Sequence, residues 1–210
     1  MKRRTFLRAS AAAAVLPSSF AIASCRKPPH AARPDLHHRP ADGEPRLGGL
    51  RPAVRIDGKF QTKPQMAEGF TLSDDGRTYL IKLRDGLKFH NGEPVRAQDC
   101  APSLKRWAAR ETIGQTVWQY VDECVAQDDR TLKITLKRPI GIFIDAIARG
   151  GASVAFMMPE HIAKTDPFKQ ITETIGSGPY KFVPGEFIAG AHSVYERNKD
   201  YVPRQSRRTG

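Results

Sequence analysis

Apolar and polar residues alternate with a period of two in several short stretches between residues 56 and 203. In Leu132–Leu136 every second residue is apolar, which is the pattern of a half-buried β-strand. Asp128-Asp129-Arg130 separates this stretch from Glu123–Ala126, so the pair predicts a β-hairpin. Thr78–Leu83 predicts another strand, which ends at the turn signal Asp85-Gly86.

A period of 3.6 replaces the alternation further along the chain. It predicts a helix from about Ala97 to Ala109 with one apolar stripe. Asp99 falls in the first turn, where a carboxylate suits the helix dipole. Pro102 lies several residues inside this helix, so we expect a kink or a delayed start. The stripe consists of Ala97, Cys100, Ala101, Leu104, Trp107 and Ala108.

Other segments carry shorter patterns, and together they predict an α+β protein or one part of a mixed α/β protein. Pro64–Phe70 is interpreted as a short irregular or one-turn segment. The remaining predictions are a short strand at Leu87–Phe89 closed by Asn91-Gly92, a helical turn at Gln115–Tyr120, a short helix around Ile142–Ile147, a buried strand at Val154–Met157, a helix starting at Pro159-Glu160-His161, and a hairpin of Tyr180–Val183 with Ser193–Glu196.

Residues 26–55 lack any such pattern. They are rich in Pro, Arg, His and Gly and contain no aromatic residue, so they bury too little apolar surface to offset the entropy of ordering. We interpret them as a disordered segment or as aberrant, frame-shifted translation. Residues 205–210 form an irregular tail, which we interpret in the same way, as disordered or frame-shifted.

The net charge of +12 first suggests a nucleic acid or an anionic membrane as partner. The excess lies near the ends of the chain, however. Residues 56–203 carry 20 Lys/Arg against 19 Asp/Glu, so the patterned part is close to neutral. This distribution argues against a nucleic-acid role.

The first 25 residues have the form of an export signal. A basic start precedes an alanine-rich apolar run that is too short to span a bilayer. Arg3 and Arg4 begin a twin-arginine-like motif, although Lys2 leaves the ordinary secretion route open. Ile22–Cys25 resembles a lipobox, which makes Cys25 a candidate lipidation site, and the alternative is cleavage after Ala23. The predicted location is the periplasm, with or without a lipid anchor to the outer face of the inner membrane.

The remaining cysteines are Cys100 and Cys124. In an oxidising compartment they could form a disulfide. The alternative is a pair of buried thiols that pack as small hydrophobic side chains.

The residues that could carry chemistry favour structural roles. His90, Glu93 and Asp99 match no metal-ligand spacing that has a mechanical basis, and His90, which lies beside a turn, is interpreted as a solvated residue at a strand end. Gly176-Ser177-Gly178 lacks the Gly-Lys-Ser/Thr ending of a phosphate loop, and Glu160 and His161 point apart on a helix. Trp107, Trp118, Tyr120 and Phe143 suit a core better than a ligand cleft. We therefore predict no catalytic, cofactor-binding or metal-binding residue and no enzyme activity.

Two stretches resemble a known family. EGFTLSDDGRTYLIKLRDGLKFHNGEPVRAQDCAPSLKRW and IGSGPYKFVPGEFIAGAHSVYERNKDYVPR are similar to the signature stretches of family 5 extracellular solute-binding proteins, the dipeptide- and oligopeptide-binding type. The second stretch has a Gly-Ser-Gly-Pro-Tyr loop and an ending with Arg197, Asn198 and Tyr201. The resemblance runs from about Gly58 to Arg204.

The resemblance implies a periplasmic binding protein type II-like fold, whose two lobes close on a solute. The solute passes to an ABC permease, and separate ATPase subunits hydrolyse ATP. Residues 56–166 are then a subdomain inserted into the first lobe, and residues 167–204 are a partial return to that lobe. The chain is an N-terminal fragment in this interpretation, and peptides are the favoured solute class. No ligand-binding residue is assigned.

The sequence departs from the family pattern in two ways. Arg96 replaces a Thr that would cap the helix, a loss that typically costs about 1 kcal/mol, so the helix start is in doubt. Relatives are also roughly twice as long or longer, and the second lobe is missing. The alternatives are a twin-arginine-exported enzyme, for which no cofactor motif is found, and a non-functional gene remnant.

Overall fold

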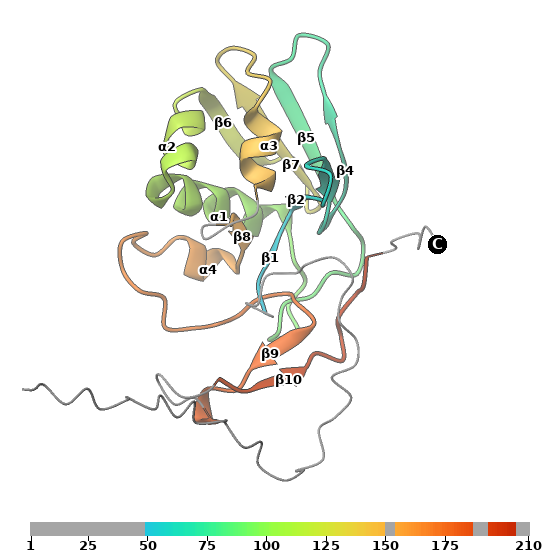
Figure 1. The fold of residues 1–210 in the computed structure, drawn as a ribbon, viewed down its shortest axis with the longest axis vertical. Helices are drawn as coiled ribbons and strands as arrows, with labels where there is room; N and C mark the ends of the chain where they lie inside the picture. The colour runs from blue at the N-terminus through green and yellow to red at the C-terminus, as the bar shows by residue number, and fades with distance from the viewer. Residues whose placement is uncertain (1–48, 150–153, 187–192, 205–210) are drawn as a thin grey trace, which may run out of the picture. The chain divides into compact units, whose positions relative to one another are not determined.

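A four-stranded antiparallel sheet forms the centre of the computed structural model, which describes residues 49–149, 154–186 and 193–204 (Figure 1). The strand order is β4-β5-β7-β6, with β4 at Ala67–Leu72, β5 at Thr78–Leu83, β7 at Thr131–Leu136 and β6 at Val121–Ala126. The predicted hairpin of β6 and β7 and the predicted strand β5 are confirmed.

Alternation along β5 and β7 decides which face of the sheet is buried. Ile81 pairs with Leu132, and Tyr79 pairs with Ile134. All four side chains are buried. They share one face of the sheet, because successive residues of a strand point to opposite faces.

Three helices cover the buried face. Helix α1 (Ala97–Arg110) packs on β6 and β7 and against α2 (Thr112–Trp118), while α3 (Phe143–Ala148) packs on the β2–β3 hairpin. The Tyr79 and Phe143 rings lie 5.2 Å apart, so α3 also joins the core of the sheet. The helix expected around Ile142–Ile147 is therefore confirmed. The helical turn expected at Gln115–Tyr120 overlaps the second half of α2.

The doubts about the start of α1 were wrong. The helix begins at Ala97 and continues through Pro102. Arg96 occupies the N-cap position, and its own N–H donates to Asp99 Oδ2 at 2.8 Å. This is the half of a capping box that needs no N-cap side-chain oxygen. Pro102 has no N–H to donate to the carbonyl of Gln98, so the helix continues with that one bond missing.

Two further predictions fail near the start of the described chain. Residues 26–55 were interpreted as disordered or aberrant, yet β1 (Arg51–Pro52) and the first two residues of β2 (Val54–Ile56) form strands within this range. Val54 is fully buried because β2 packs against α3. Residues 26–48 lie outside the described residues.

The segment Pro64–Phe70 was expected to be irregular, but it contributes to β3 (Thr62–Pro64) and β4. A register shift between Ala67 and Gly69 interrupts β4, which obscures its period of two. Leu87–Phe89, in contrast, forms no strand and makes a single bridge between Lys88 and Pro94.

The remaining elements are short. The strand expected at Val154–Met157 is reduced to β8 (Phe156–Met157), which pairs with β1. The predicted helix start at Pro159 and the predicted hairpin after residue 179 are confirmed. These elements are α4 (Glu160–Ala163), β9 (Tyr180–Phe182), the 3₁₀ turn Pro184–Glu186 and β10 (Tyr195–Arg197).

Over the described ranges, no helix combines the length and apolar character needed to cross a bilayer.

Candidate functional site

His90 is the point at which the two motifs of the sequence meet. Its backbone N–H donates to the carbonyl of Gly176 at 2.8 Å, and Gly176 N–H donates back to His90 Nδ1 at 3.3 Å. His90 Nε2 lies 3.2 Å from the Gly178 carbonyl. The neutral ring with its proton on Nε2 satisfies both contacts, because Nδ1 then accepts from Gly176 and Nε2 donates to Gly178. The ring therefore connects the Asn91-Gly92 turn to a loop 86 residues further along the chain.

The loop Gly176–Gly178 also packs against the start of the described chain. Gly178 N–H donates to the Gly49 carbonyl at 2.9 Å. A Cβ placed on Gly176 would lie 1.8 Å from that same oxygen, so only glycine allows this approach. Ser177 is buried, and its hydroxyl lies 3.5 Å from Met66 Sδ.

Asn198 fixes the other side of the loop. Its side-chain amide donates to the Gly178 carbonyl at 3.0 Å, and its backbone N–H donates to the Pro179 carbonyl at 2.8 Å. Only 3% of Asn198 is exposed. The Asn of the second motif thus holds the Gly-Ser-Gly-Pro turn closed.

The end of the second motif lies along residues from the first part of the described chain. The guanidinium of Arg51 stacks over the Tyr201 ring, 4.8 Å from its centroid. Arg84 donates to the Val202 and Pro203 carbonyls at 3.2 and 2.9 Å. These contacts define a junction of residues 49–53 and 84–90 with residues 176–186 and 193–204, which we call the motif junction.

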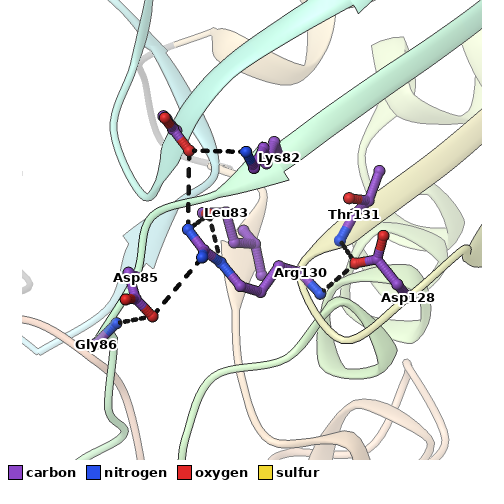
Figure 2. A network of polar contacts seen from close by, with 8 residues as sticks. Lys82, Leu83, Asp85, Gly86, Asp128, Arg130 and Thr131 are labelled. Carbon is purple, nitrogen blue, oxygen red and sulfur yellow. Dashed lines mark hydrogen bonds and ion pairs between the residues drawn. The ribbon is translucent and has the colours of Figure 1, made fainter.

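The Asp85-Gly86 turn is fixed by a separate polar network around Arg130 (Figure 2). The Arg130 side chain donates to the Leu83 carbonyl through Nε and Nη2, at 3.2 and 3.0 Å, and pairs with Asp85 at 3.8 Å. Asp128 accepts from the N–H groups of Arg130 and Thr131, and these bonds lower the pKa of its carboxyl. The ion pairs are largely exposed, so their main effect is to position the turn.

A polar stripe on α1 binds the segment that contains α4. Ser103 Oγ is 3.2 Å from the Met158 carbonyl and 3.1 Å from the Met158 N–H. Arg106 Nη1 donates to the Thr165 carbonyl at 2.6 Å, and Nη2 donates to the Lys169 carbonyl at 3.0 Å. This stripe was not predicted, although its spacing of i, i+4 and i+7 from Asp99 is the signal of a second helix face.

Asp99 begins this stripe and contacts both helices. Its Oδ1 accepts from the Glu160 N–H at 2.8 Å, while Oδ2 accepts from Arg96. Burial raises the pKa of the Asp99 carboxyl, although these two hydrogen bonds act in the opposite direction. Asp99 is therefore a structural link between α1 and α4.

The three residues considered as metal ligands have different neighbours. His90 bonds the Gly176–Gly178 loop, Glu93 accepts from Asn91 Nδ2 at 2.8 Å, and Asp99 serves the two helix starts. The structure does not bring them together. In the described part of the chain, no group of three His, Cys, Asp or Glu side chains is placed to hold a metal.

The other candidates for chemistry have structural partners as well. The N–H groups of Gly176 and Gly178 bond His90 and Gly49, so a phosphate would have to displace protein acceptors. Glu160 pairs with Lys164, and His161 pairs with Glu173, as expected for side chains that point apart.

The four aromatic residues considered for a core or a ligand cleft have different surroundings. Trp107 and Phe143 are buried in the core, and Trp118 packs on its edge. Tyr120 is partly exposed and lies beneath the Arg138 guanidinium, 4.6 Å from it. The core interpretation is right for three of the four.

Cys100 and Cys124 are both free thiols, so the structure favours the second of the two alternatives. Burial raises the pKa of Cys124 to about 12 and that of Cys100 further. Both therefore remain protonated and unreactive near neutral pH. Cys25, Arg3 and Arg4 lie outside the described residues.

The neutral state of His90 makes the motif junction sensitive to acid. Burial lowers the pKa of the imidazole below its ordinary 6.5, and the nearby charge of Lys181 adds to this, against the hydrogen bonds to the backbone of Gly178 and Thr174. The unfolded chain then binds the proton more tightly than the folded chain. This part of the free energy of unfolding is complete above pH 6.5 and is lost as the pH falls below that value.

We expect the wild type to lose stability between about pH 7.5 and about pH 5, and the His90→Asn variant to lose less. Asn retains an acceptor for the Gly176 N–H but does not titrate. Urea denaturation followed by tryptophan fluorescence at each pH measures the difference. His161→Asn is the control and should behave as the wild type, because the His161 side chain is exposed. An identical pH dependence in His90→Asn and wild type would contradict this role.

Comparison with known proteins agrees with this geometry. A solved structure of the oligopeptide-binding protein AppA from Bacillus subtilis, in complex with a nonapeptide, matches with a TM-score of 0.59 and 23% identity, over 74% of this chain and 31% of that one. The described part thus has the fold of part of a periplasmic binding protein, and the predicted fold class is confirmed.

Residues 61–208 match the model of the bacterial extracellular solute-binding proteins, family 5. The chain belongs to this family, as the two motifs predicted.

Two curated relatives show the extent of the similarity. A probable peptide ABC transporter periplasmic-binding protein of Sinorhizobium fredii is 42% identical over 149 residues, which are 71% of this chain and 28% of the relative. The glutathione-binding protein GsiB of Escherichia coli is 35% identical over 137 residues, which are 60% of this chain and 24% of the relative. The chain spans about a quarter of the length of these relatives.

Proposed function

We propose that this chain serves solute capture for an ABC importer and that its solutes are peptides. The observation that carries the proposal is the 42% identity to a probable peptide ABC transporter periplasmic-binding protein. The partners would be an ABC permease and its ATPase subunits. The described residues supply positioning contacts at the motif junction, which suits a binding protein that performs no chemistry on its solute.

Within this proposal, residues 56–166 form the inserted subdomain of the first lobe and residues 167–204 return toward that lobe. The core supports the division, because the four-stranded sheet and α1 to α3 all lie between Ala67 and Ala148. The strands β9 and β10 form a separate two-stranded sheet, which the motif junction links to the rest. The β1 and β2 strands extend the first unit to residues before 56.

Export is the second part of the proposal. Arg3 and Arg4 would direct the chain to the periplasm, and lipidation at Cys25 would hold it at the outer face of the inner membrane. Mass spectrometry of the exported chain tests where the signal is cleaved and whether Cys25 is lipidated. A diacylglyceryl group on Cys25 supports it, whereas a mature chain that begins at Ser24 contradicts the anchor.

Replacement of the matched segment in the Sinorhizobium fredii relative tests the function. We expect a chimera that carries residues 49–204 of this chain to retain peptide binding, because the motif junction, which begins at Gly49, supplies the contacts that position the segment. Calorimetry with a peptide mixture gives the dissociation constant. The chain by itself should bind weakly or not at all, since two lobes enclose the solute.

A folded chimera without peptide affinity would contradict the assignment of this segment to a peptide importer. Micromolar binding by the isolated chain would contradict the need for a second lobe. In the same chimera, Gly176→Ala should weaken peptide binding and Gly185→Ala should not, because only the first change disturbs the motif junction.

A further inference from the structure

The Asn91-Gly92 turn joins an exposed side-chain amide to a residue that has no side chain. The chain contains two asparagines, Asn91 and Asn198. Asn91 is exposed, whereas only 3% of Asn198 is exposed. An asparagine amide is thermolabile, and it is most open to attack by the next backbone nitrogen when that residue is glycine, because no Cβ shields the nitrogen. A Cβ placed on Gly92 would meet nothing within 4 Å, so the space beside this nitrogen is open.

The backbone of the folded turn opposes such an attack. The Gly92 N–H donates to the Phe89 carbonyl at 2.9 Å, and the Phe89 N–H donates to the Glu93 carbonyl at 2.8 Å. Phe89 is only 2% exposed, so the turn is anchored in the core. The Gly92 nitrogen loses its proton when it reacts, and its hydrogen bond to Phe89 therefore has to break first.

Glu93 also contacts both polar atoms of the Asn91 amide. The Glu93 N–H donates to Asn91 Oδ1 at 3.1 Å, and Asn91 Nδ2 donates to Glu93 Oε2 at 2.8 Å. His90, which precedes Asn91, exchanges two hydrogen bonds with Gly176. The amide can turn toward the Gly92 nitrogen only after a local opening that breaks these contacts. The rate then follows the population of the open turn.

We propose that Asn91 is a site of spontaneous deamidation and that the motif junction restrains the reaction. The Gly92 nitrogen forms a bond to the side-chain carbonyl carbon of Asn91, and the bond from that carbon to Nδ2 breaks. The Gly92 proton passes to water, while the amide nitrogen takes up a proton and leaves as ammonia. Water then opens the resulting succinimide ring at either carbonyl, which gives aspartate or isoaspartate.

The product would weaken the turn that restrained the reaction. A carboxylate at position 91 replaces the Nδ2 donor that faces Glu93 Oε2, so two like charges meet at hydrogen-bonding distance. Isoaspartate also adds one atom to the backbone, which shifts the register of the hydrogen bonds across the turn. His90 lies next to this change, so an aged chain loses part of the motif junction. The inference goes beyond solute capture and does not depend on it.

Mass spectrometry of the full chain during incubation in mildly alkaline buffer measures the reaction. Trypsin cleaves after Lys88 and Arg96, so residues 89–96 form one peptide. Its mass rises when OH replaces NH₂, and chromatography separates the aspartyl from the isoaspartyl form. We expect both forms to accumulate at position 91. Asn198, measured in a second digest with a protease that cleaves at acidic residues, should keep its amide.

The restraint by the fold is tested with urea and with one pair of variants. The chain unfolded in urea should react at position 91 roughly tenfold faster than the folded chain. Gly176→Ala should raise the rate in the folded chain roughly fivefold, because it breaks both hydrogen bonds between Gly176 and His90. Gly185→Ala should react at the wild-type rate, since a Cβ there meets nothing within 4 Å. If Gly176→Ala does not fold, His90→Ala replaces it, because it removes only the two ring contacts.

A further set of variants tests the effect of the product. Asn91→Asp should lower Tm in the wild type. It should lower Tm less in the Glu93→Gln chain, because the Gln amide can donate to the new carboxylate. An equal loss in both chains would contradict the repulsion between positions 91 and 93.

Three results would overturn the proposal. The first is an unreacted Asn91 in the chain unfolded in urea. The second is an equal rate in the folded and the unfolded chain, and the third is an equal rate in Gly176→Ala and Gly185→Ala.

Discussion

Gly176→Ala is expected to lower the free energy of unfolding by about 3 kcal/mol, near the upper end for overpacking in a close contact. The new Cβ would lie 1.8 Å from the Gly49 carbonyl oxygen, which is backbone and cannot rotate away. Relief requires the loop to move, and that movement breaks the Gly178–Gly49 hydrogen bond and both hydrogen bonds between Gly176 and His90. Urea denaturation measures the change.

Gly185→Ala is the control for this prediction. A Cβ on Gly185 meets nothing within 4 Å, and its φ is not positive, so the change in stability should stay within about 0.5 kcal/mol. Equal stability of the Gly176→Ala variant and the wild type would show that the loop does not pack on Gly49. The motif junction would then lose its main support.

Arg106→Ala is expected to destabilise the chain by about 2–3 kcal/mol, because hydrogen bonds to charged groups are strong and the side chain also loses its packing. The substitution removes the donors to the Thr165 and Lys169 carbonyls. Only 9% of Arg106 is exposed, so water replaces these donors poorly. Hydrogen exchange should show faster opening of residues 158–169, and denaturation should show the loss of stability.

Lys105→Ala is the matched control on the same helix. Lys105 is exposed, and its replacement by the best helix former should change stability by less than about 0.5 kcal/mol. If Arg106→Ala behaves like Lys105→Ala, α1 does not hold the α4 segment through this guanidinium.

The sequence predicted those elements that depend on neighbouring residues. Asp128-Asp129-Arg130 between two alternating stretches was sufficient for the β6–β7 hairpin, and the stripe from Ala97 to Ala108 was sufficient for α1. The same local rules failed where the deciding contact is distant. β2 is ordered because Val54 packs on α3, which lies about ninety residues later in the chain.

The family followed from the sequence, and the roles of its motif residues did not. His90 was interpreted as a solvated strand-end residue, and Gly176-Ser177-Gly178 as a structural turn. The first interpretation was wrong, because the ring is partly buried against the second. No pattern in either motif indicates that they touch across 86 residues.

By itself, the sequence determined most helices and strands of the patterned middle, the family and the absence of a recognisable catalytic motif. Only the tertiary structure decided that His90 and Asn198 both hold the Gly176–Gly178 turn and that Arg106 is buried. Periodicity and turn chemistry act over a few residues, so they can be recognised in a short window. Burial and long-range hydrogen bonds depend on which distant segments pack together, and that information is present only once the chain has folded.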